Sequence, residues 1–419
     1  MSARISDNDV QYALDLVGNI CNQAGPGLPG SLKERERAEI IRTELETHLG
    51  KENVSTEDFS LAPDAFPSAM PVGCMLMLIA ALLNILAGHA STGARLAAAV
   101  SSVMLILLAQ FVIIFEFLFF YEFIDRFFRK KNSVNVIGTL RKPGAVNIGK
   151  LLIISGHHDS ARENWWFRIF GYAFYFPLVT VVLGINVVMV MSIIQLAGVT
   201  GAVPGMITFG TISWKLMIYP VLPTFLFSLL FSGSKKNGGK VPGAVDNLSA
   251  CASLTAMCRF LAEHPSCIPE DTEIRFITFG SEEAGLRGSR RYVSRHLEDL
   301  KRMDCRVLNL ETISHPEISI LTSDRNRLVK NSPLMVKTVA AAAERAGVPY
   351  KIKPFPFGAS DSASFSKAGL MAATILPFSI PRQLVAFYHQ RCDRPEVLTR
   401  EPLSNVLKLT LEWIRNGGE

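Results

Sequence analysis

The sequence predicts an α/β fold, a mainly parallel mixed sheet sandwiched by helices and interrupted by two inserted transmembrane helical hairpins. Strand-like apolar runs such as EIRFITFG and AATILPF alternate with helical stretches in the second half of the chain. Continuous apolar strands between helices are typical of a parallel sheet that is covered on both faces. Four further apolar runs approach or exceed the roughly 20 residues that cross a bilayer, at about residues 70–88, 97–121, 170–196 and 216–232.

The elements of the α/β fold can be followed along the chain. Residues 1–66 contain two helical patterns separated by the loop GPGLPGS, and then a short extended stretch. SVNVIGTL and KLLIISG, within residues 132–160, are strand-like. From residue 241 the runs EIRFITFG, CRVLNLETI and AATILPF indicate strands, and helical patterns lie near 245–263, 287–299, 333–346 and 402–415. We therefore expect the polar pieces 1–66, 126–165 and 235–419 to form one domain, with transmembrane hairpins at 67–125 and 166–234.

The composition favours membrane spans attached to a globular body. Of 419 residues, 49% are hydrophobic and only 19% are charged, whereas average domains carry about 25% charged residues. The net charge of +6 is concentrated beside the apolar runs, so we expect a lipid bilayer and not a nucleic acid as partner.

The seven cysteines are odd in number and scattered, which argues against a disulfide framework and for a reducing compartment. No signal peptide is expected in MSARISDNDVQYALDLV.

Flanking charges predict how the hairpins are oriented. Only Arg95 and Lys215 lie at the hairpin tips. Basic residues gather instead on the side shared by the polar segments: Arg126, Arg129, Lys130, Lys131, Arg162, Arg168, Lys235, Lys236 and Lys240. Because basic residues near span ends mark the cytoplasmic side, we expect a multi-pass membrane protein with four spans and a cytoplasmic catalytic domain.

Candidate functional residues lie where the predicted strands end. His157 and Asp159 follow LLIISG, Glu282 and Glu283 follow RFITFG, and Glu311 follows RVLNL. Two others lie outside the strands, since GAVDNLS places Asp246 at a helix start and FYHQRCD supplies His389. Ligands of parallel sheets bind beyond the carboxyl ends of the strands, so these side chains are expected to converge on one rim.

These motifs resemble those of the zinc aminopeptidase family that includes bacterial leucyl aminopeptidases, glutamate carboxypeptidase and glutaminyl cyclases. The family's His-x-Asp, Gly-Ala-x-Asp-Asn, Glu-Glu-x-Gly-Leu-x-Gly-Ser, strand-end acid and Tyr-His appear here in the same order. They are GHHDS, GAVDNLS, SEEAGLRGS, LNLET and FYHQRCD. The resemblance covers the chain except the hairpins, and SEEAGLRGS with GAVDN is its most specific part.

The resemblance implies two zinc ions per chain and a role for each motif residue. Asp246 is expected to bridge the two ions, and Asp159 to brace the imidazole of His157. Glu282 is expected to be the general base that takes a proton from the attacking water. The implied zinc ligands are His157, Asp246, Glu283, Glu311 and His389.

Two departures from the family pattern concern the site. The family usually has Asp where Glu311 stands, so a longer side chain has to reach the same ion; the alternative is a carboxylate at the edge of the core. The family's Ser-Asp-His appears as ASDSASF, so Ser362 replaces a histidine and Asp361 is expected to be structural.

His158 points away from His157 and is expected to be packed or on the substrate side. Cys251 and Cys258, at helical spacing, fit core packing better than a metal site.

The position of the second hairpin suggests where the enzyme acts. His157 and Asp246 are 89 positions apart, and the second hairpin fills most of that interval. We therefore expect a metal centre near the bilayer and a membrane-anchored di-zinc metallopeptidase, foremost an aminopeptidase, whose peptide substrates lie near the membrane surface. Alternatives are a non-hydrolytic member of the fold, such as a cyclase or a silent receptor-like protein, and a membrane transporter with a regulatory domain. A transporter is disfavoured because Glu116 is the only charged residue inside the spans. The sequence predicts no oligomeric state.

Overall fold

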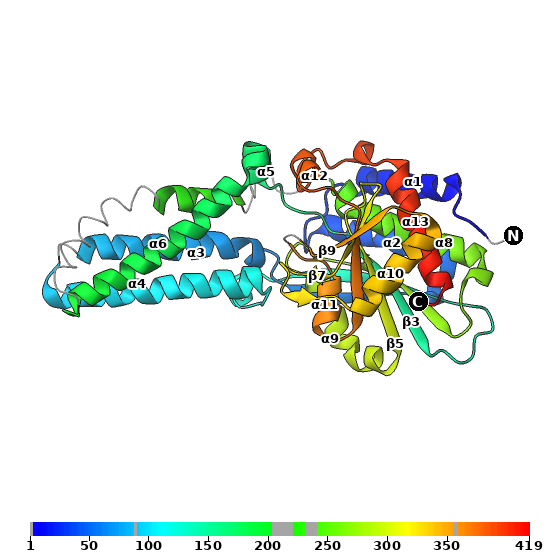
Figure 1. Cartoon of the computed structure of the whole chain (residues 1–419), viewed down its shortest axis with the longest axis horizontal. Helices are drawn as coiled ribbons and strands as arrows, with labels where there is room; N and C mark the ends of the chain where they lie inside the picture. Colours follow the sequence, from blue (N-terminus) through cyan, green and yellow to red (C-terminus); the bar gives the residue numbers. More distant parts are fainter. Residues whose placement is uncertain (1–2, 88–89, 203–220, 232–240, 356–357) are drawn as a thin grey trace. The chain divides into compact units, whose positions relative to one another are not determined.

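The computed structural model describes residues 3–87, 90–202, 221–231, 241–355 and 358–419, shown as a cartoon in Figure 1. The chain forms two compact units. Unit 1 comprises Met1–Pro63, Lys130–Glu163 and Asn237–Glu419, and unit 2 comprises Asp64–Arg129 and Asn164–Lys236. Each unit is thus assembled from pieces that are distant in the sequence.

Unit 1 begins with two helices and an edge strand, α1 (Asp7–Gln23), α2 (Leu32–Leu49) and β1 (Val54–Leu61). Serines define both helix starts. Ser6 and Asp9 form a capping box at α1, and the side chain of Ser31 accepts a hydrogen bond from the backbone N–H of Glu34 at α2. The Gly-rich loop between the helices is the one that the sequence predicts.

An eight-stranded sheet is the centre of unit 1, in the order β1-β2-β4-β3-β5-β10-β6-β9. Strands β4, β3, β5 and β10 run parallel, and β1, β2 and β6 introduce antiparallel pairs. The prediction of a mainly parallel mixed sheet is confirmed. The remaining strand bounds are β2 (Lys131–Arg141), β3 (Lys150–His157), β4 (Thr272–Phe279), β5 (Asp304–Leu310), β6 (Ile318–Leu321), β9 (Tyr350–Lys353) and β10 (Met371–Leu376).

Helices cover both faces of this sheet, and side-chain alternation assigns the faces. Leu151 and Ile153 of β3 pack in one core cluster with Tyr292 of α9 (Arg287–Arg302) and Phe365 of α11 (Ser362–Lys367). On the opposite face, Gly156 of β3 approaches α8 (Ser249–Glu263), and α2 packs on β2. Helix α10 (Pro333–Ala346) and helix α13 (Arg400–Arg415) pack against each other, and α13 also contacts α8.

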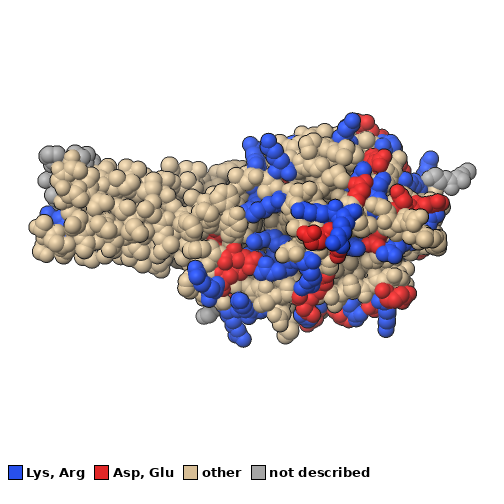
Figure 2. All heavy atoms as spheres, turned by 90° about the horizontal axis from the view of Figure 1, so that it is seen from below, with Lys and Arg blue, Asp and Glu red and all other residues tan. Residues whose placement is uncertain are grey.

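In the part of unit 2 that the structure describes, three helices are long and apolar enough to cross a membrane. They are α3 (Ala65–Ala87), α4 (Thr92–Val112) with its π-helical extension Ile113–Leu118, and α6 (Tyr175–Val199). A shorter apolar helix covers Val221–Phe231. Figure 2 shows almost no charged atoms over these helices, in contrast with unit 1.

The helices of unit 2 pack through a mainly apolar cluster, including Met77, Ile106 and Val188, with a few polar residues, while other large apolar side chains face outward. Met104, Leu183 and Leu86 are more than half exposed. Between the helices, the side-chain amide of Asn84 donates to the hydroxyl of Ser192 at 3.1 Å, and Gln195 donates to the carbonyl of Asn84 at 3.0 Å. Such an arrangement, apolar outside with interhelical hydrogen bonds inside, is typical of helices in lipid.

The bounds of the first three predicted spans differ from those of these helices. The fourth predicted span, 216–232, lies partly outside the described residues, and its described part is the apolar helix Val221–Phe231. The third, predicted at 170–196, begins at Tyr175 because the chain turns at Gly171, whose φ is +49°. A separate short helix, α5 (Trp165–Phe170), precedes that turn.

Candidate metal centre

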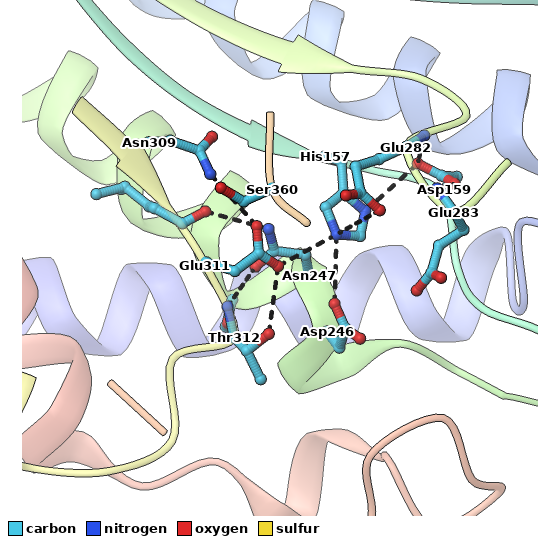
Figure 3. Close-up of polar contacts among 12 residues, drawn as sticks. His157, Asp159, Asp246, Asn247, Glu282, Glu283, Asn309, Glu311, Thr312 and Ser360 are labelled. Atoms are coloured by element: carbon cyan, nitrogen blue, oxygen red, sulfur yellow. Dashed lines mark hydrogen bonds and ion pairs between the residues drawn. The ribbon is translucent and has the colours of Figure 1, made fainter. Parts of the chain in front are cut away.

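Three neighbouring parallel strands deliver polar residues to one edge of the sheet (Figure 3). His157 ends β3, the Glu282–Glu283 loop follows β4, and Glu311 follows β5. Asp246 lies in η5 (Ala244–Leu248), the turn that opens α8. His389 follows α12 (Arg382–Ala386) with a φ of +51°. The structure therefore brings together all five residues that the sequence predicts as ligands.

The first set of ligand atoms converges on His157. Its Nε2 lies 3.3 Å from Asp246 Oδ1 and 3.4 Å from Glu311 Oε1. All three side chains are buried. Glu311 Oε2 accepts a hydrogen bond from the amide of Asn309 at 3.3 Å, which orients the carboxylate. The Glu311 side chain is thus long enough to reach the first set.

The second set converges on His389. Its Nε2 lies 3.1 Å from Asp246 Oδ2 and 3.0 Å from Glu283 Oε1. Asp246 therefore directs one oxygen to each set. A carboxylate used in this way can bridge two cations.

Asp159 connects the first set to the Glu282–Glu283 loop. Its Oδ1 lies 3.3 Å from His157 Nδ1. Its two oxygens also accept hydrogen bonds from the backbone N–H groups of Glu282 and Glu283, both at 3.0 Å (Figure 3). Asp159 thereby faces the imidazole and also fixes the loop that carries the two glutamates.

Burial of several carboxylates in one place leaves the centre short of positive charge. Burial raises the pKa of Glu311 to about 7 and raises the pKa values of Glu282 and Glu283. Burial disfavours the charged form of His157, yet the facing carboxylates, Glu282 first, raise its pKa well above the ordinary value. Bound cations would relieve this repulsion among acidic groups.

The residues fit zinc. Nitrogen and carboxylate oxygen ligands lie about 2.0–2.2 Å from a tetrahedral zinc ion, so neighbouring ligand atoms are roughly 3.3–3.5 Å apart. The separations of 3.0 to 3.4 Å in the two sets are close to this value. His389 Nε2 and Asp246 Oδ2 are also buried without a hydrogen-bond partner in the structure, as expected of atoms that coordinate a metal.

Neighbouring side chains hold the Asp246 turn. The carboxylate of Asp393 accepts hydrogen bonds from the backbone N–H groups of Val245 at 2.7 Å and Asp246 at 3.2 Å. The side chain of Asn247 donates to the carbonyl of Leu310 at 3.1 Å and accepts from the N–H of Thr312 at 2.9 Å. The turn is therefore fastened both to the His389 loop and to the end of β5.

Sequence reasoning missed two buried ionisable residues behind this centre, Glu34 and Arg37 of α2. Glu34 accepts hydrogen bonds from the hydroxyl of Ser281 and the N–H of Gly30, both at 2.7 Å, and burial raises its pKa to about 8. Arg37 is completely buried. A signal existed, because both residues share the buried stripe of α2 with Ile41 and Leu45, where polar side chains are unusual.

The other candidates lie outside the two ligand sets. None of the three His, Asp and Glu groups able to hold a metal among the described residues includes His158. The Nδ1 of His158 lies 3.2 Å from the hydroxyl of Thr278, and burial lowers its pKa to about 4. Ser362 joins a buried hydroxyl network, donating to Asp324 at 3.0 Å. Cys251 and Cys258 are buried in α8.

A pocket opens beside the ligand atoms. His157, Asp246, Glu282, Glu283 and Glu311 form its polar end. The rest of its wall is mainly apolar, from Phe355, Leu376, Phe378, Ile380 and Leu384. The pocket therefore combines a charged end with a space suited to an apolar group.

Comparisons with known proteins agree with this geometry. Residues 231–414 match the model of peptidase family M28. Over 169 residues the chain is 32% identical to aminopeptidase YwaD of Bacillus subtilis (strain 168); the match covers 39% of this chain and 35% of that protein. The matched region thus spans about a third of the length of this curated relative.

Solved structures share the fold at low sequence identity. A zinc aminopeptidase from Bacillus subtilis, BSAP, superposes with a TM-score of 0.52 at 15% identity, covering 96% of this chain and 93% of that one. For the Fimbriiglobus ruber glutaminyl cyclase the TM-score is 0.56 at 12% identity, with 99% and 97% covered. A leucine aminopeptidase precursor from Bacteroides thetaiotaomicron gives 0.55 at 15%, with 99% of both chains covered. The chain is thus similar to peptidase family M28 over residues 231–414 and shares the fold of zinc aminopeptidases and glutaminyl cyclases.

Proposed function

We propose that the protein is a membrane-anchored di-zinc aminopeptidase that removes N-terminal residues from peptides near the membrane surface. The observation that supports this most is the sharing of Asp246 between two ligand sets, one with His157 and Glu311 and one with Glu283 and His389. Two-metal sites of this kind are used by aminopeptidases.

In this proposal each ligand set holds one zinc ion. Zinc supplies a Lewis acid for the scissile carbonyl and makes water a competent nucleophile near neutral pH. Asp159 keeps His157 Nε2 directed into the site by facing its Nδ1. Asp246 fixes the separation of the two sets through its two oxygens.

Glu282 is the proposed proton carrier. Its Oε2 lies 3.9 Å from His157 Nε2, and its backbone N–H is held by Asp159, so the carboxylate stays at the polar end of the pocket. Oε2 would accept a proton from the attacking water and deliver it to the leaving amine. Its raised pKa, caused by burial, makes it a stronger base than an exposed glutamate.

The apolar wall of the pocket indicates which substrates are preferred. Phe355, Leu376 and Phe378 offer no partner for a charged side chain. We therefore expect peptides with Leu, Met or Phe at the N-terminus to be cleaved faster than those with Asp or Lys. A single methylene group in an apolar pocket already changes kcat/KM by roughly 10- to 200-fold, so we expect at least a tenfold preference.

The membrane anchor and its orientation are part of the proposal. Three apolar helices support spans. At the hairpin between α3 and α4, Arg95 donates to the carbonyls of Ala87 and Ala90, both at 3.1 Å, and so acts as a helix C-cap. The basic residues near the other span ends, such as Arg126 and Arg129, support a cytoplasmic catalytic unit.

A glutaminyl cyclase is the second candidate, because the Fimbriiglobus ruber cyclase shares the fold with a TM-score of 0.56. The two candidates give different products from a peptide that begins with glutamine. An aminopeptidase releases free glutamine and the shortened peptide, whereas a cyclase releases ammonia and leaves the peptide with a pyroglutamyl end.

Metal content and hydrolysis together test the proposal. Purified full-length protein should contain about two zinc ions per chain. A chelator should abolish hydrolysis of a mixed peptide library, and zinc or cobalt should restore it. Asp246→Ala should lose both ions, whereas His389→Ala should retain about one, because only Asp246 belongs to both sets. Hydrolysis by metal-free protein, or cyclisation without hydrolysis, would contradict the proposal.

A further inference from the structure

The two ligand sets depend on two chain segments that the sequence separates. His157 ends β3, and unit 1 then stops at Glu163. The chain returns to unit 1 before Asp246, whose turn is described from Val241 onward. His157 Nε2 and Asp246 Oδ1 lie 3.3 Å apart. To keep this distance, the segment after His157 and the segment before Asp246 must be held in fixed positions relative to each other.

Arg37 contacts both ends. From α2, its Nη1 donates to the carbonyl of His158 at 3.2 Å, and its Nη2 donates to the carbonyl of Pro242. The third nitrogen, Nε, donates to the carbonyl of Gly25 at 2.8 Å. One guanidinium therefore joins the residue after a metal ligand, the loop before another, and the start of the α1–α2 loop.

The two ends also touch each other where Arg37 joins them. Gly243 has a φ of +67°, and a Cβ built on it would lie 2.9 Å from Ser160 Cβ and 3.5 Å from Arg37 Nη1. The N–H of Ser160 donates to the carbonyl of Gly27 at 2.8 Å. The two segments are therefore in contact, and any separation or sliding of one past the other would break the hydrogen bonds of Arg37.

Packing alone does not explain the use of arginine here. Arg37 is completely buried and, among the described residues, forms no ion pair with a carboxylate. Burial of such a charge is costly, and an apolar side chain of similar volume would fill the space at lower cost. An apolar side chain would not supply three donors with fixed directions.

A second contact fastens the same interruption to the His389 loop. Arg391, two residues after His389, donates through Nε to Glu163 at 2.9 Å and pairs with it through Nη2 at 2.8 Å. Glu163 is buried. The last residue of unit 1 before the interruption is therefore tied to the loop that supplies a ligand of the second set.

We propose that Arg37 and the Glu163–Arg391 ion pair are positioning residues for the metal centre, holding the ends of the membrane insertion so that His157, Asp246 and His389 keep ligand geometry. This inference rests on the proposed function, since it assigns a role toward the zinc ions. None of the three residues touches the reacting atoms; they act on the ligands through the backbone and the loop.

Zinc affinity is the direct test. Full-length protein in detergent is freed of metal and titrated with zinc against a chromophoric chelator. Arg37→Lys, Arg37→Met and Arg391→Gln should weaken zinc binding by roughly 10- to 100-fold, the range for residues that support metal ligands. On the loaded enzyme, kcat should fall more than KM rises, because the apolar pocket wall is unchanged. Glu163→Gln should resemble Arg391→Gln, and the double variant should be no worse than either single one.

Arg306→Met is the matched control. Arg306 is also a buried arginine that donates to a backbone carbonyl, that of Gly418 at 3.0 Å, but it lies near the start of β5, at the end opposite Glu311. It should lower thermal stability without changing zinc affinity. If Arg37→Met does not fold, the zinc affinities of Arg37→Lys and of Arg391→Gln, at a half-exposed position, still test the proposal. Wild-type zinc affinity in these variants, or an equal loss in Arg306→Met, would overturn the positioning role. Wild-type protein that binds no zinc would instead overturn the proposed function.

Discussion

Glu282 is the side chain whose removal should separate chemistry from metal binding. Glu282→Gln keeps the shape of the side chain and its backbone hydrogen bond to Asp159, but it removes the base. We expect kcat to fall by at least about a hundredfold, with the zinc content unchanged. Steady-state kinetics and elemental analysis of the same preparation measure both.

Glu298→Gln, an exposed glutamate of α9, is the control for this variant and should behave as wild type. Loss of zinc together with activity in Glu282→Gln would mean that Glu282, and not Glu283, is the ligand. The two neighbours are distinguishable in the structure because His389 Nε2 lies 3.0 Å from Glu283 Oε1.

The candidate ligands of the site could be predicted from the sequence residue by residue. The residues that hold the ligand-bearing segments in place could not. Histidines and carboxylates at predicted strand ends can be recognised in the sequence itself, so the candidate ligands do not require any geometry to be identified. Arg37, Glu34 and Asp393 act through backbone groups of other segments, and a sequence does not show which carbonyl or N–H a side chain will meet. Only their unusual burial can be suspected in advance.

Among the secondary-structure elements, the long central strands were predicted and the short outer ones were not. The apolar runs of β3, β4 and β5 are seven or eight residues long. The missed strands β6 and β9 have four residues each, and β9 is partly exposed. Strands this short are selected by their pairing with a neighbour, β10 for β6 and β6 for β9, which local pattern does not reveal.

Close packing of β3 on α8 sets a limit on the strand that carries His157. A Cβ on Gly156 would lie 2.8 Å from the Cβ of Ala250, so Gly156→Ala should push the strand and helix apart and destabilise the protein by about 1–3 kcal/mol. Thermal unfolding followed by circular dichroism measures this. Gly149→Ala, in the loop before the same strand and with nothing within 4 Å of the added Cβ, should leave the unfolding midpoint within a degree or two. Equal behaviour of the two variants would show that β3 and α8 adjust freely.

For the whole molecule, the presence of long apolar helices could be predicted from the sequence more reliably than the residues at which they start. Composition alone identified the apolar runs, but Ser91 and Gly171 set where α4 and α6 begin, and three described helices have the length to span a bilayer. A hydropathy pattern does not weigh a helix start against a glycine turn, so the predicted bounds differ from those of the helices.

Topology is the molecular property that the family resemblance does not supply. With a cytoplasmic catalytic unit, a cysteine at the exposed Thr92 should react in intact cells with a thiol reagent that does not cross membranes. A cysteine at the exposed Lys301 of α9 should react only after lysis. Both are introduced into a cysteine-free background, because the chain has seven native cysteines. Labelling of Lys301→Cys but not Thr92→Cys in intact cells would place the catalytic unit outside the cytoplasm.

The insertion between His157 and Asp246 also determines when, during synthesis, a complete set of candidate ligands first exists. His157 leaves the ribosome 89 residues before Asp246, and α6 is made in between. Glu283, Glu311 and His389 follow later still. A nascent chain therefore has neither ligand set until α6, the last long apolar helix among the described residues, has been made. A chain that stalls before α6 is finished carries only His157 of the five proposed ligands, so under the proposed function an unfinished copy would have no hydrolytic activity.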